Sequence, residues 1–382
     1  MNDPFGFDTL DVEWLRAKSG AKWHRHPGQL AAWVADMDFR PVPAVVAALQ
    51  SRLDSGDLGY PDWKSNTAGT PIRELFAARA AARYGWQLDP YDVREFCDVV
   101  QAVQAVLYVA TRPGDRVVVL TPSYPPLVHS VEGGGLRLVD HPLGPDGWDL
   151  DALDTRLVHE SASVLLLCHP HNPTGHVFTR DELRRLGEIA ARHDLLIISD
   201  EIHADLTYAP RTHLPIAAGC PEHADRIVTI HSASKAFNLA GLRYALAHIG
   251  SSRVHDGLTA LPDHLLGAVN LLAAEATYAA WSVGDEWLAA VLAHLDRNRL
   301  LLADLLAEHL PQVQYSPPDG TYLAWLDCRS LGDGDTPFEL FRSRGVQLSC
   351  GLDFGANGAG HVRLNVATSA ALLTRIVETM AG

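Results

Sequence analysis

Short apolar runs alternate with longer amphipathic segments through the middle of the chain, and this alternation restricts the possible folds more than any other feature. Each run is rich in Val, Ile and Leu, which predicts a buried strand. The predicted strands lie at 116–120, 136–139, 163–168, 195–199 and 226–230. Fully apolar strands separated by helices are typical of an α/β fold in which helices cover both faces of a mostly parallel sheet.

The predicted helices fall between and around these strands. The clearest is 179–193, where apolar residues recur on one face. Another is expected to begin after Thr70, as its N-cap, and to end near Gly85. Further helices are predicted at about 43–53, 103–111, 123–131, 150–159, 284–310, 337–344 and 370–380.

The length of 382 residues exceeds what one hydrophobic core usually supports, so two domains are expected. The long helix at 284–310 is expected to lead into a smaller α+β unit with strands at 321–326 and 361–366. We predict an N-terminal segment (1–45) that contributes to the small domain and the active site, a large domain (46–285) and a small C-terminal domain (286–382).

Composition excludes several classes of protein. The net charge of −15 argues against a nucleic-acid binder, which needs basic residues to neutralise phosphates. The five cysteines are scattered without CxxC spacing, which argues against a disulfide framework or structural zinc and favours a reducing cytoplasm. Neither a signal peptide nor a run long enough to span a membrane is visible, so we expect a cytoplasmic protein that binds no membrane.

One lysine follows a predicted strand in the stretch from Ile230 to Arg243. Lys235 is flanked by Ser and Ala, small neighbours that leave room for a bulky group on its nitrogen. The chain has only four lysines, and Lys235 is the only one after Lys64. Arginine cannot form a Schiff base, whereas lysine can. An ordinary loop lysine in an Arg-rich chain is the alternative reading of this segment alone.

Polar residues cluster where the predicted strands end. Ligands of parallel sheets bind beyond the carboxyl ends of the strands, so these clusters predict one site. They are Tyr124, Asn172, Asp200–His203 and Ser232–Lys235.

Three motifs together closely resemble the fold-type I pyridoxal-phosphate (PLP) enzymes, the aspartate aminotransferase superfamily: 171–175 (HNPTG), 199–203 (SDEIH) and 232–235 (SASK). The resemblance implies a large domain with a seven-stranded type of sheet and a smaller C-terminal domain. Other segments resemble one subgroup, the MalY/PatB-like cystathionine β-lyases, which are C–S lyases. These segments are 33–39, 200–203, 320–327 and 362–365.

The resemblance implies PLP as cofactor and assigns roles around its ring. Lys235 would hold the cofactor covalently and then act as the base at the substrate Cα. Asp200 would pair with the pyridine nitrogen, and Asn172 would donate to the ring hydroxyl oxygen, with His203 near the same edge. Tyr124 would stack on the ring.

The resemblance also implies contacts for the phosphate and the substrate. Ser232, Arg243 and the backbone at Val103 and Gln104, where a helix is expected to begin, would hold the phosphate. Tyr60, which alone reads as a surface ring, would reach the phosphate of a neighbouring subunit in a homodimer. In the substrate site, Arg363 would grip the α-carboxylate of an amino acid, with Ala35 nearby.

The sequence departs from the family pattern at a few positions. Gln101 and Gln104 stand where the family often has Gly or Pro, close to the expected phosphate contacts. His176 replaces a common Arg, and Cys350 replaces a common Pro near the substrate mouth. These departures concern phosphate contacts and substrate identity more than the class of chemistry.

Three other classes fit parts of the sequence. Ser232 to Lys235 matches the S-x-x-K signature of penicillin-binding proteins, but the companion Ser-Asp-Asn and Lys-Thr-Gly motifs are missing. His169, His171 and the 200–203 cluster suggest a metallohydrolase, but HExxH spacing is missing and no metal is predicted. A non-enzymatic PLP-binding regulator is disfavoured because the Lys, Asp and Arg of the catalytic pattern are all present.

The subgroup motifs favour β-elimination over the other PLP reactions. The expected reaction removes a thiol from an S-linked L-cysteine conjugate, cystathionine or a larger molecule, and leaves pyruvate and ammonia. Transamination, or decarboxylation-coupled oxidative deamination of such a conjugate, are the alternatives.

Overall fold

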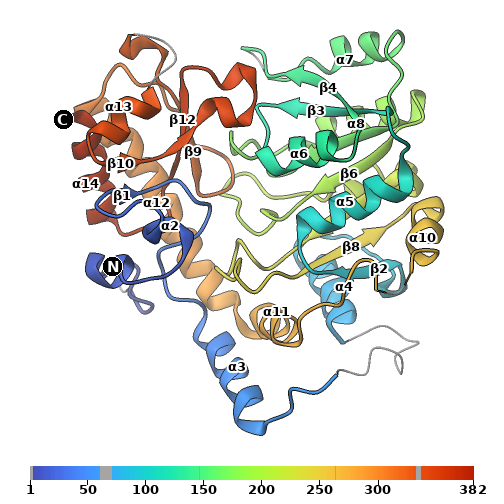
Figure 1. Cartoon of the computed structure of the whole chain (residues 1–382), viewed down its shortest axis with the longest axis horizontal. Coiled ribbons are helices and arrows are strands. Elements are labelled where there is room, and N and C mark those ends of the chain that lie inside the picture. The colour runs from blue at the N-terminus through green and yellow to red at the C-terminus, as the bar shows by residue number, and fades with distance from the viewer. Residues whose placement is uncertain (1–2, 61–70, 146, 263, 333–336) are drawn as a thin grey trace.

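The computed structural model describes residues 3–60, 71–145, 147–262, 264–332 and 337–382. Its centre is a seven-stranded sheet (Figure 1). All neighbouring strands pair in parallel except β8, which is antiparallel to both of its neighbours. The spatial order is β2 (Val93–Phe96), β8 (Ala245–Ile249), β7 (Ile227–His231), β6 (Leu196–Asp200), β5 (Val164–Cys168), β3 (Arg116–Thr121) and β4 (Arg137–Pro142).

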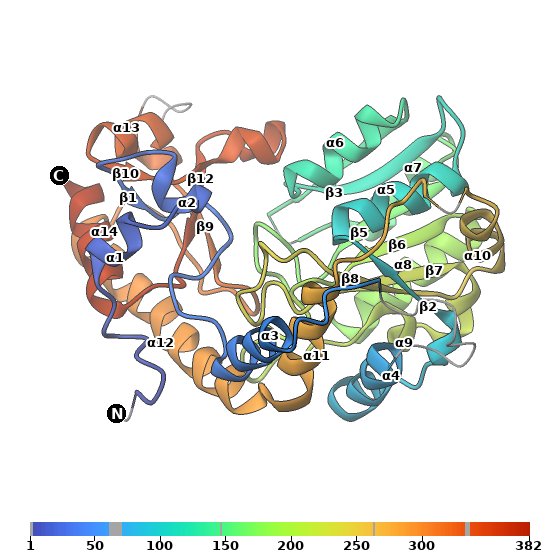
Figure 2. The same cartoon turned by 60° about the horizontal axis from the view of Figure 1, so that its bottom comes forward.

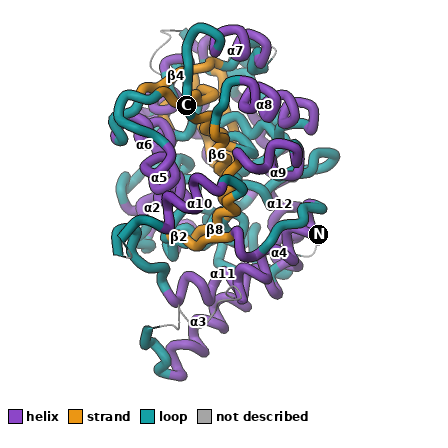
Figure 3. Tube along the Cα trace, turned by 90° about the vertical axis from the view of Figure 1, so that its right-hand side faces the viewer, coloured by secondary structure: helices purple, strands orange, loops and turns teal. Residues whose placement is uncertain are grey.

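Helices cover both faces of this sheet (Figure 3). One face packs against α5 (Val99–Ala110), α6 (Pro125–Gly133) and α10 (Ser252–Thr259). The other face packs against α7 (Leu150–Leu157), α8 (Arg180–Arg192) and α9 (Ile216–Gly219). Helix α8 begins with a capping box in which Thr179 and Glu182 satisfy each other's backbone N–H groups.

The predicted α/β class and the five predicted strands are confirmed, but the sequence analysis missed β2 and β8. Strand β8 is Ala-Leu-Ala-His-Ile, and alanine is uncommon in strands. Strand β2 is an edge strand that contains Arg94 and Glu95, so it lacks the continuous apolar run of a central strand. These two strands complete the sheet on the side next to β7.

The second part of the molecule follows α11 (Leu271–Val283) and the long helix α12 (Asp285–His309). It contains the three-stranded sheet β11-β12-β9, whose neighbours pair antiparallel, with α13 and α14 alongside (Figure 2). The bounds are β9 (Leu323–Asp327), α13 (Pro337–Ser343), β10 (Val346–Gln347), β11 (Ser349–Cys350), β12 (His361–Asn365) and α14 (Ala370–Ala381).

The N-terminal segment packs on this second part. It contains α1 (Val12–Arg16), α2 (Ala21–His24) and β1 (Leu30–Ala31), and β1 pairs in parallel with β10. This pairing agrees with an N-terminal contribution to the small domain, while the domain boundaries at 45 and 285 remain predictions.

Helix α3 (Pro43–Ser55) extends from the body of the molecule at the bottom of Figure 1, and α4 (Pro71–Tyr84) returns to the sheet. The predicted N-cap Thr70 lies outside the described residues, and Gly85 ends α4 with a positive φ of 65°. Among the residues that the structure describes, no helix is both long and apolar enough to cross a membrane.

Candidate active site

A cavity of about 490 Å³ opens beyond the carboxyl ends of β5, β6 and β7. This is the edge at which parallel sheets bind ligands. The cavity brings together residues from the N-terminal segment, α5, α6 and the loops after the three strands. Of the predicted site residues, it is lined by Ala35, Gln104, Tyr124, Asn172, Asp200, His203, Ser232, Lys235 and Arg243.

Lys235 lies in the loop after β7, and its Nζ donates a hydrogen bond of 2.8 Å to the carbonyl oxygen of Ala35. Burial lowers the pKa of Lys235 below its ordinary value, and the positive charge of Arg363 adds to this effect, while Asp36 and Asp200 oppose it. A lowered pKa increases the fraction of neutral amine, which is the form that attacks a carbonyl and accepts a proton.

Asp200 ends β6 and is 2% exposed. Burial raises the pKa of Asp200 to about 6, although a hydrogen bond from the Ile202 backbone N–H and the charge of Lys235 act in the opposite direction. A buried carboxyl group with a raised pKa is one that a cationic partner in the cavity would stabilise.

Glu201 points away from the cavity into a polar cluster behind Asp200. Its carboxylate accepts hydrogen bonds from His213, His231, Ser199 and the Ile216 backbone N–H. These four bonds satisfy the buried charge and hold the end of β6 in place.

Arg363 lies on β12 and is 6% exposed. One guanidinium nitrogen, Nη1, donates to Asn172 Oδ1 at 2.8 Å, and Nη2 donates to the Trp33 carbonyl at 2.9 Å and to Ser349 Oγ at 3.2 Å. Burial lowers the pKa of Arg363 to about 10. Because Asn172 uses its oxygen for Arg363, its amide NH2 group is the part that can donate to a ligand.

Tyr124 and His203 also line the cavity, near enough to Asp200 and Lys235 for those charges to act on them. Tyr124 is the N-cap residue of α6, and burial, followed by the charge of Asp200, raises its pKa, so the phenol is neutral. Burial and the cations Lys235 and Arg363 hold the pKa of His203 well below its ordinary value, so the imidazole is neutral as well. His203 Nδ1 is buried without a hydrogen-bond partner among the described residues.

The other end of the cavity contains groups suited to an anion. The first turn of α5 lies there, with Ser232, Ser234 and Arg243 opposite. Ser232 Oγ lies 2.5 Å from the Tyr244 carbonyl and 2.8 Å from Ser234 Oγ. Arg243 Nη1 forms an ion pair of 2.5 Å with Asp98, and its side chain is 70% exposed.

The predicted start of this helix at Val103 is wrong. Helix α5 begins four residues earlier at Val99, with Asp98 as the N-cap whose carboxylate accepts from the Gln101 backbone N–H. Val103 is therefore in the second turn, fully buried in the core, and does not line the cavity. Gln104 lines the cavity but donates through Nε2 to Ser130. Since Asp98 binds the Gln101 N–H, the first-turn N–H groups open to an anion are those of Val99 and Val100.

Residues 33–39, of which Ala35 lines the cavity, are held by many side-chain hydrogen bonds. Each of the seven carbonyl oxygens in this segment accepts at least one hydrogen bond from a side chain, and the donors come from three parts of the chain. The donors are Arg363 and Ser349 to residue 33, Asn365 to 34, Lys235 and Tyr322 to 35, Asn365 and Lys22 to 36, Asn238 to 37, Lys18 to 38 and Asn238 to 39.

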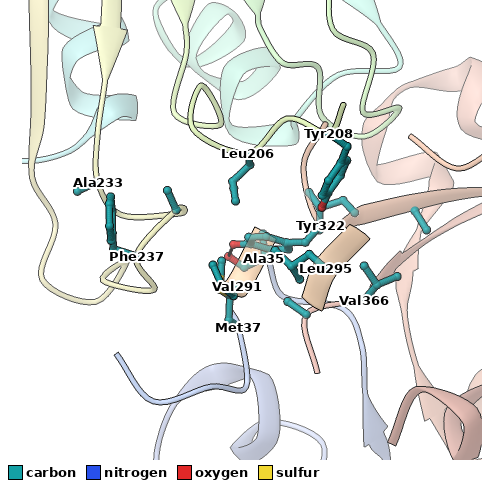
Figure 4. Close-up of a cluster of buried hydrophobic side chains, with 14 of the residues drawn as sticks. Ala35, Met37, Leu206, Tyr208, Ala233, Phe237, Val291, Leu295, Tyr322 and Val366 are labelled. Atoms are coloured by element: carbon teal, nitrogen blue, oxygen red, sulfur yellow. Dashed lines mark hydrogen bonds between the residues drawn. The ribbon is translucent and has the colours of Figure 1, made fainter. Parts of the chain in front are cut away.

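Apolar contacts support the same segment. Figure 4 shows Ala35 and Met37 beside Val291 of α12 and Tyr322, with Phe237 from the Lys235 loop in the same cluster. Ala35, predicted as a substrate-binding residue, lines the cavity and contacts Lys235 through its backbone carbonyl, while its contact with a substrate stays a prediction. The sequence analysis missed Ser349 and Tyr322, whose roles come from tertiary contacts that no local pattern reveals.

Tyr60 does not line the cavity of its own chain. Its side chain is fully exposed at 101%. Residues 61–63, which follow Tyr60, lie outside the described residues. The predicted contact of Tyr60 with a neighbouring subunit therefore stays a prediction.

The residues of the cavity fit PLP group by group. The amine of Lys235 suits the aldehyde, the carboxyl of Asp200 suits the pyridine nitrogen, and the aromatic ring of Tyr124 suits the face of the pyridine. The anion-binding end suits the phosphate. A fold of this type with such a site defines a PLP-dependent enzyme of the aspartate aminotransferase fold.

Comparison with known proteins agrees. The family described as aminotransferase class I and II matches residues 34–380, and the chain belongs to this family. It is 35% identical to cystathionine beta-lyase PatB of Bacillus subtilis, over 90% of this chain and 89% of that protein. It is 32% identical to the cystathionine beta-lyase of Corynebacterium glutamicum, over 90% of this chain and 91% of that protein.

A solved structure gives the same result. The PLP-bound C-S lyase from Staphylococcus hominis superposes with a TM-score of 0.90 at 29% identity, covering 98% of this chain and 97% of that chain. The cofactor of this enzyme is PLP, as the sequence motifs predicted.

Proposed function

We propose that the chain is a PLP-dependent C–S lyase that eliminates a thiol from an S-linked L-cysteine conjugate. One observation carries this proposal: the side chains of Lys235 and Arg363 both donate hydrogen bonds to the same short segment. Lys235 donates to the carbonyl of residue 35 and Arg363 to that of residue 33, so the two side chains are held close together. This arrangement supports a substrate whose carboxylate lies at Arg363 and whose Cα lies near Lys235. The names of the relatives support elimination over transamination.

The net reaction consumes one water. The conjugate R–S–CH2–CH(NH3+)–COO− loses its Cα proton and its Cβ–S bond, and the released enamine is hydrolysed. The products are the thiol R–SH, pyruvate and ammonium. No keto acid is consumed, which separates this reaction from transamination.

The roles of the residues follow from their surroundings. When bound, PLP supplies an electron-withdrawing ring that makes the Cα proton of the substrate acidic. The Lys235 amine, whose pKa is lowered by burial, accepts that proton. Asp200 holds a proton on the pyridine nitrogen. Arg363 binds the α-carboxylate as a fork and gives up its bond to the Trp33 carbonyl or to Asn172 when it does so.

We also propose that the working unit is a homodimer in which Tyr60 reaches the neighbour's phosphate. The support is the exposure of apolar side chains on α3 and just after it. Leu53 is 49% exposed, Leu58 55% and Tyr60 101%. Apolar side chains gathered on one projecting element are typical of an interface. Light scattering on the purified protein measures the mass, and a monomer that retains full activity would contradict this part.

A cytoplasmic location is part of the proposal. All five cysteines are unpaired, as expected in a reducing compartment.

The test uses cystathionine and a bulkier S-alkyl cysteine as substrates for the purified holoenzyme. We expect pyruvate and free thiol in equal amounts, with no need for a keto acid. Turnover that depends on an added keto acid, without thiol release, would instead identify an aminotransferase. Loss of carbon dioxide in step with turnover would identify the decarboxylative alternative.

A further inference from the structure

The anion-binding end of the cavity contains a carboxylate. Asp98 lines the cavity as the N-cap of α5, and its Oδ1 accepts from the Gln101 backbone N–H at 2.7 Å. Its Oδ2 lies 2.5 Å from Arg243 Nη1. One side chain thus occupies both positive features that a phosphate would use, the N-terminus of α5 and the guanidinium group of Arg243.

Asp98 and the phosphate of PLP carry charges of the same sign. Within the part of the chain that the structure describes, Arg243 is the only cationic side chain at this end of the cavity, since the other residues there are Ser232, Ser234, Tyr244 and the first turn of α5. The phosphate must therefore share Arg243 with a carboxylate or displace it. The Asp98 side chain is 26% exposed, so water and salt weaken the repulsion without removing it.

We propose that Asp98 weakens the hold of this enzyme on the phosphate of PLP, and so sets the affinity and exchange rate of the cofactor. This inference rests on PLP as the cofactor and not on which reaction the enzyme performs. Most of the binding free energy of PLP then comes from its contacts with Lys235 and Asp200 at the ring end. The cofactor is also exchanged faster than it would be if residue 98 carried no charge.

The test is Asp98→Asn, which removes the charge while asparagine keeps the N-cap. Asp98→Ser is a second uncharged N-cap. The matched control is Asp115→Asn, which removes one charge from a carboxylate that also accepts a backbone N–H bond, from Arg112, at the opposite edge of the sheet. Apoprotein is prepared from each holoenzyme with hydroxylamine, and circular dichroism confirms that each variant is folded.

Three probes separate phosphate from ring. For D98N and D98S we expect the Kd of PLP to fall by about 5- to 10-fold. This is the approximate size expected when the repulsion of one partly exposed charge is removed. We expect inorganic phosphate to bind more tightly as well, whereas pyridoxal, which lacks the phosphate, binds as to the parent protein. The rate of PLP loss from the holoenzymes on dilution should fall, and D115N should change nothing.

Two results would overturn the inference. Unchanged PLP affinity in both variants would mean that the carboxylate does not act on the phosphate. Weaker PLP binding would mean that Asp98 assists by orienting Arg243. Either result leaves the proposed lyase reaction intact, whereas a parent protein that binds no PLP would remove the proposed function itself.

Discussion

The two ends of the cavity differ in burial and in how firmly their polar groups are held. At the ring end, Asp200, Arg363, Asn172 and His203 are each at most 6% exposed. Arg363 reaches Asn172 and the carbonyl of Trp33 through fixed hydrogen bonds. At the phosphate end, Arg243 is 70% exposed and is held by one ion pair.

This difference in burial means that charged side chains are destabilised at the ring end but not at the phosphate end. Burial moves the pKa of Asp200 up to about 6 and that of Arg363 down to about 10, which means that both charged forms are destabilised before a ligand arrives. Groups held in this way are preorganised for a charged ligand. Exposed groups at the phosphate end carry no such cost, so we expect substitutions there to have smaller effects.

The largest effect should come from Lys235→Ala, which removes the proposed proton acceptor at the ring end. We expect turnover to be abolished, a loss of at least about 10⁴-fold. The borohydride-trappable link to the cofactor should disappear, because no other lysine lines the cavity within the described residues. Lys235→Arg is the matched variant, since it keeps a cation but cannot form the link. Substantial activity in either variant would rule out the role of Lys235.

The next effect should come from Arg363→Lys, which keeps the charge but replaces a planar fork by a single ammonium group. Three of the contacts of Arg363 depend on the fork, to Asn172, Trp33 and Ser349. We expect kcat/KM to fall by about 100-fold, or about 3 kcal/mol. Steady-state kinetics measure it. An equal loss at the phosphate end, in Arg243→Lys, would contradict the comparison of the two ends.

A third prediction concerns the stability of the apoprotein and the pKa of Asp200. Folding raises this pKa from 3.8 to about 6, so the folded state binds the proton more tightly than the unfolded state does. The contribution of Asp200 to stability is therefore greatest below about pH 4 and is lost as the pH rises to about 6. Asp200→Asn removes this loss because asparagine does not titrate.

We expect the D200N apoprotein to gain about 3 kcal/mol over the parent at pH 8 and little at pH 4, an order-of-magnitude value for a shift of this size. Denaturant unfolding of both apoproteins at the two pH values measures the difference. A variant that is less stable by the same amount at both pH values would show that the carboxylate carries no burial cost. In the holoenzyme the sign should reverse, since the pyridine nitrogen loses its partner.

The sequence predicted the strand-end residues of the site more accurately than the contacts around them. Lys235, Asp200 and Asn172 were predictable because each follows a short apolar strand, and strand ends converge at one edge of a parallel sheet. The predicted start of α5 lies four residues late because the segment from Val99 was interpreted as leading into the helix and not as its first turn. Asp98, directly before that segment, was the N-cap signal that was overlooked.

Other features could not be read from local sequence. Strand β8 consists of residues that fit a helix as well as a strand, and only its pairing with β7 and β2 decides between them. The carbonyls of residues 33–39 accept from side chains as distant as Asn365, so those contacts exist only in the folded chain. The sequence shows the motif at 33–39, but the hydrogen bonds that hold its carbonyls are seen only in the structure.

The smallest predicted effect tests whether the hydrogen bonds around Arg363 matter individually. Ser349 Oγ accepts from Arg363 Nη2 at 3.2 Å and donates to the Trp33 carbonyl at 2.9 Å. In Ser349→Ala, Arg363 keeps its bonds to Asn172 and Trp33, so the guanidinium stays in place but is held less firmly. We expect KM to rise about threefold, or about 0.7 kcal/mol, with kcat unchanged.

Ser343→Ala is the control for that variant, because Ser343 is an exposed serine of the same domain that bonds only locally, to the Leu340 carbonyl. It should leave both constants unchanged. A fall in kcat at constant KM in S349A would mean that Ser349 acts on the chemical step and not on carboxylate binding. If KM rises threefold in S349A while kcat/KM falls 100-fold in Arg363→Lys, then carboxylate binding depends mainly on the buried guanidinium group. Each residue that holds the guanidinium in place would then contribute only slightly.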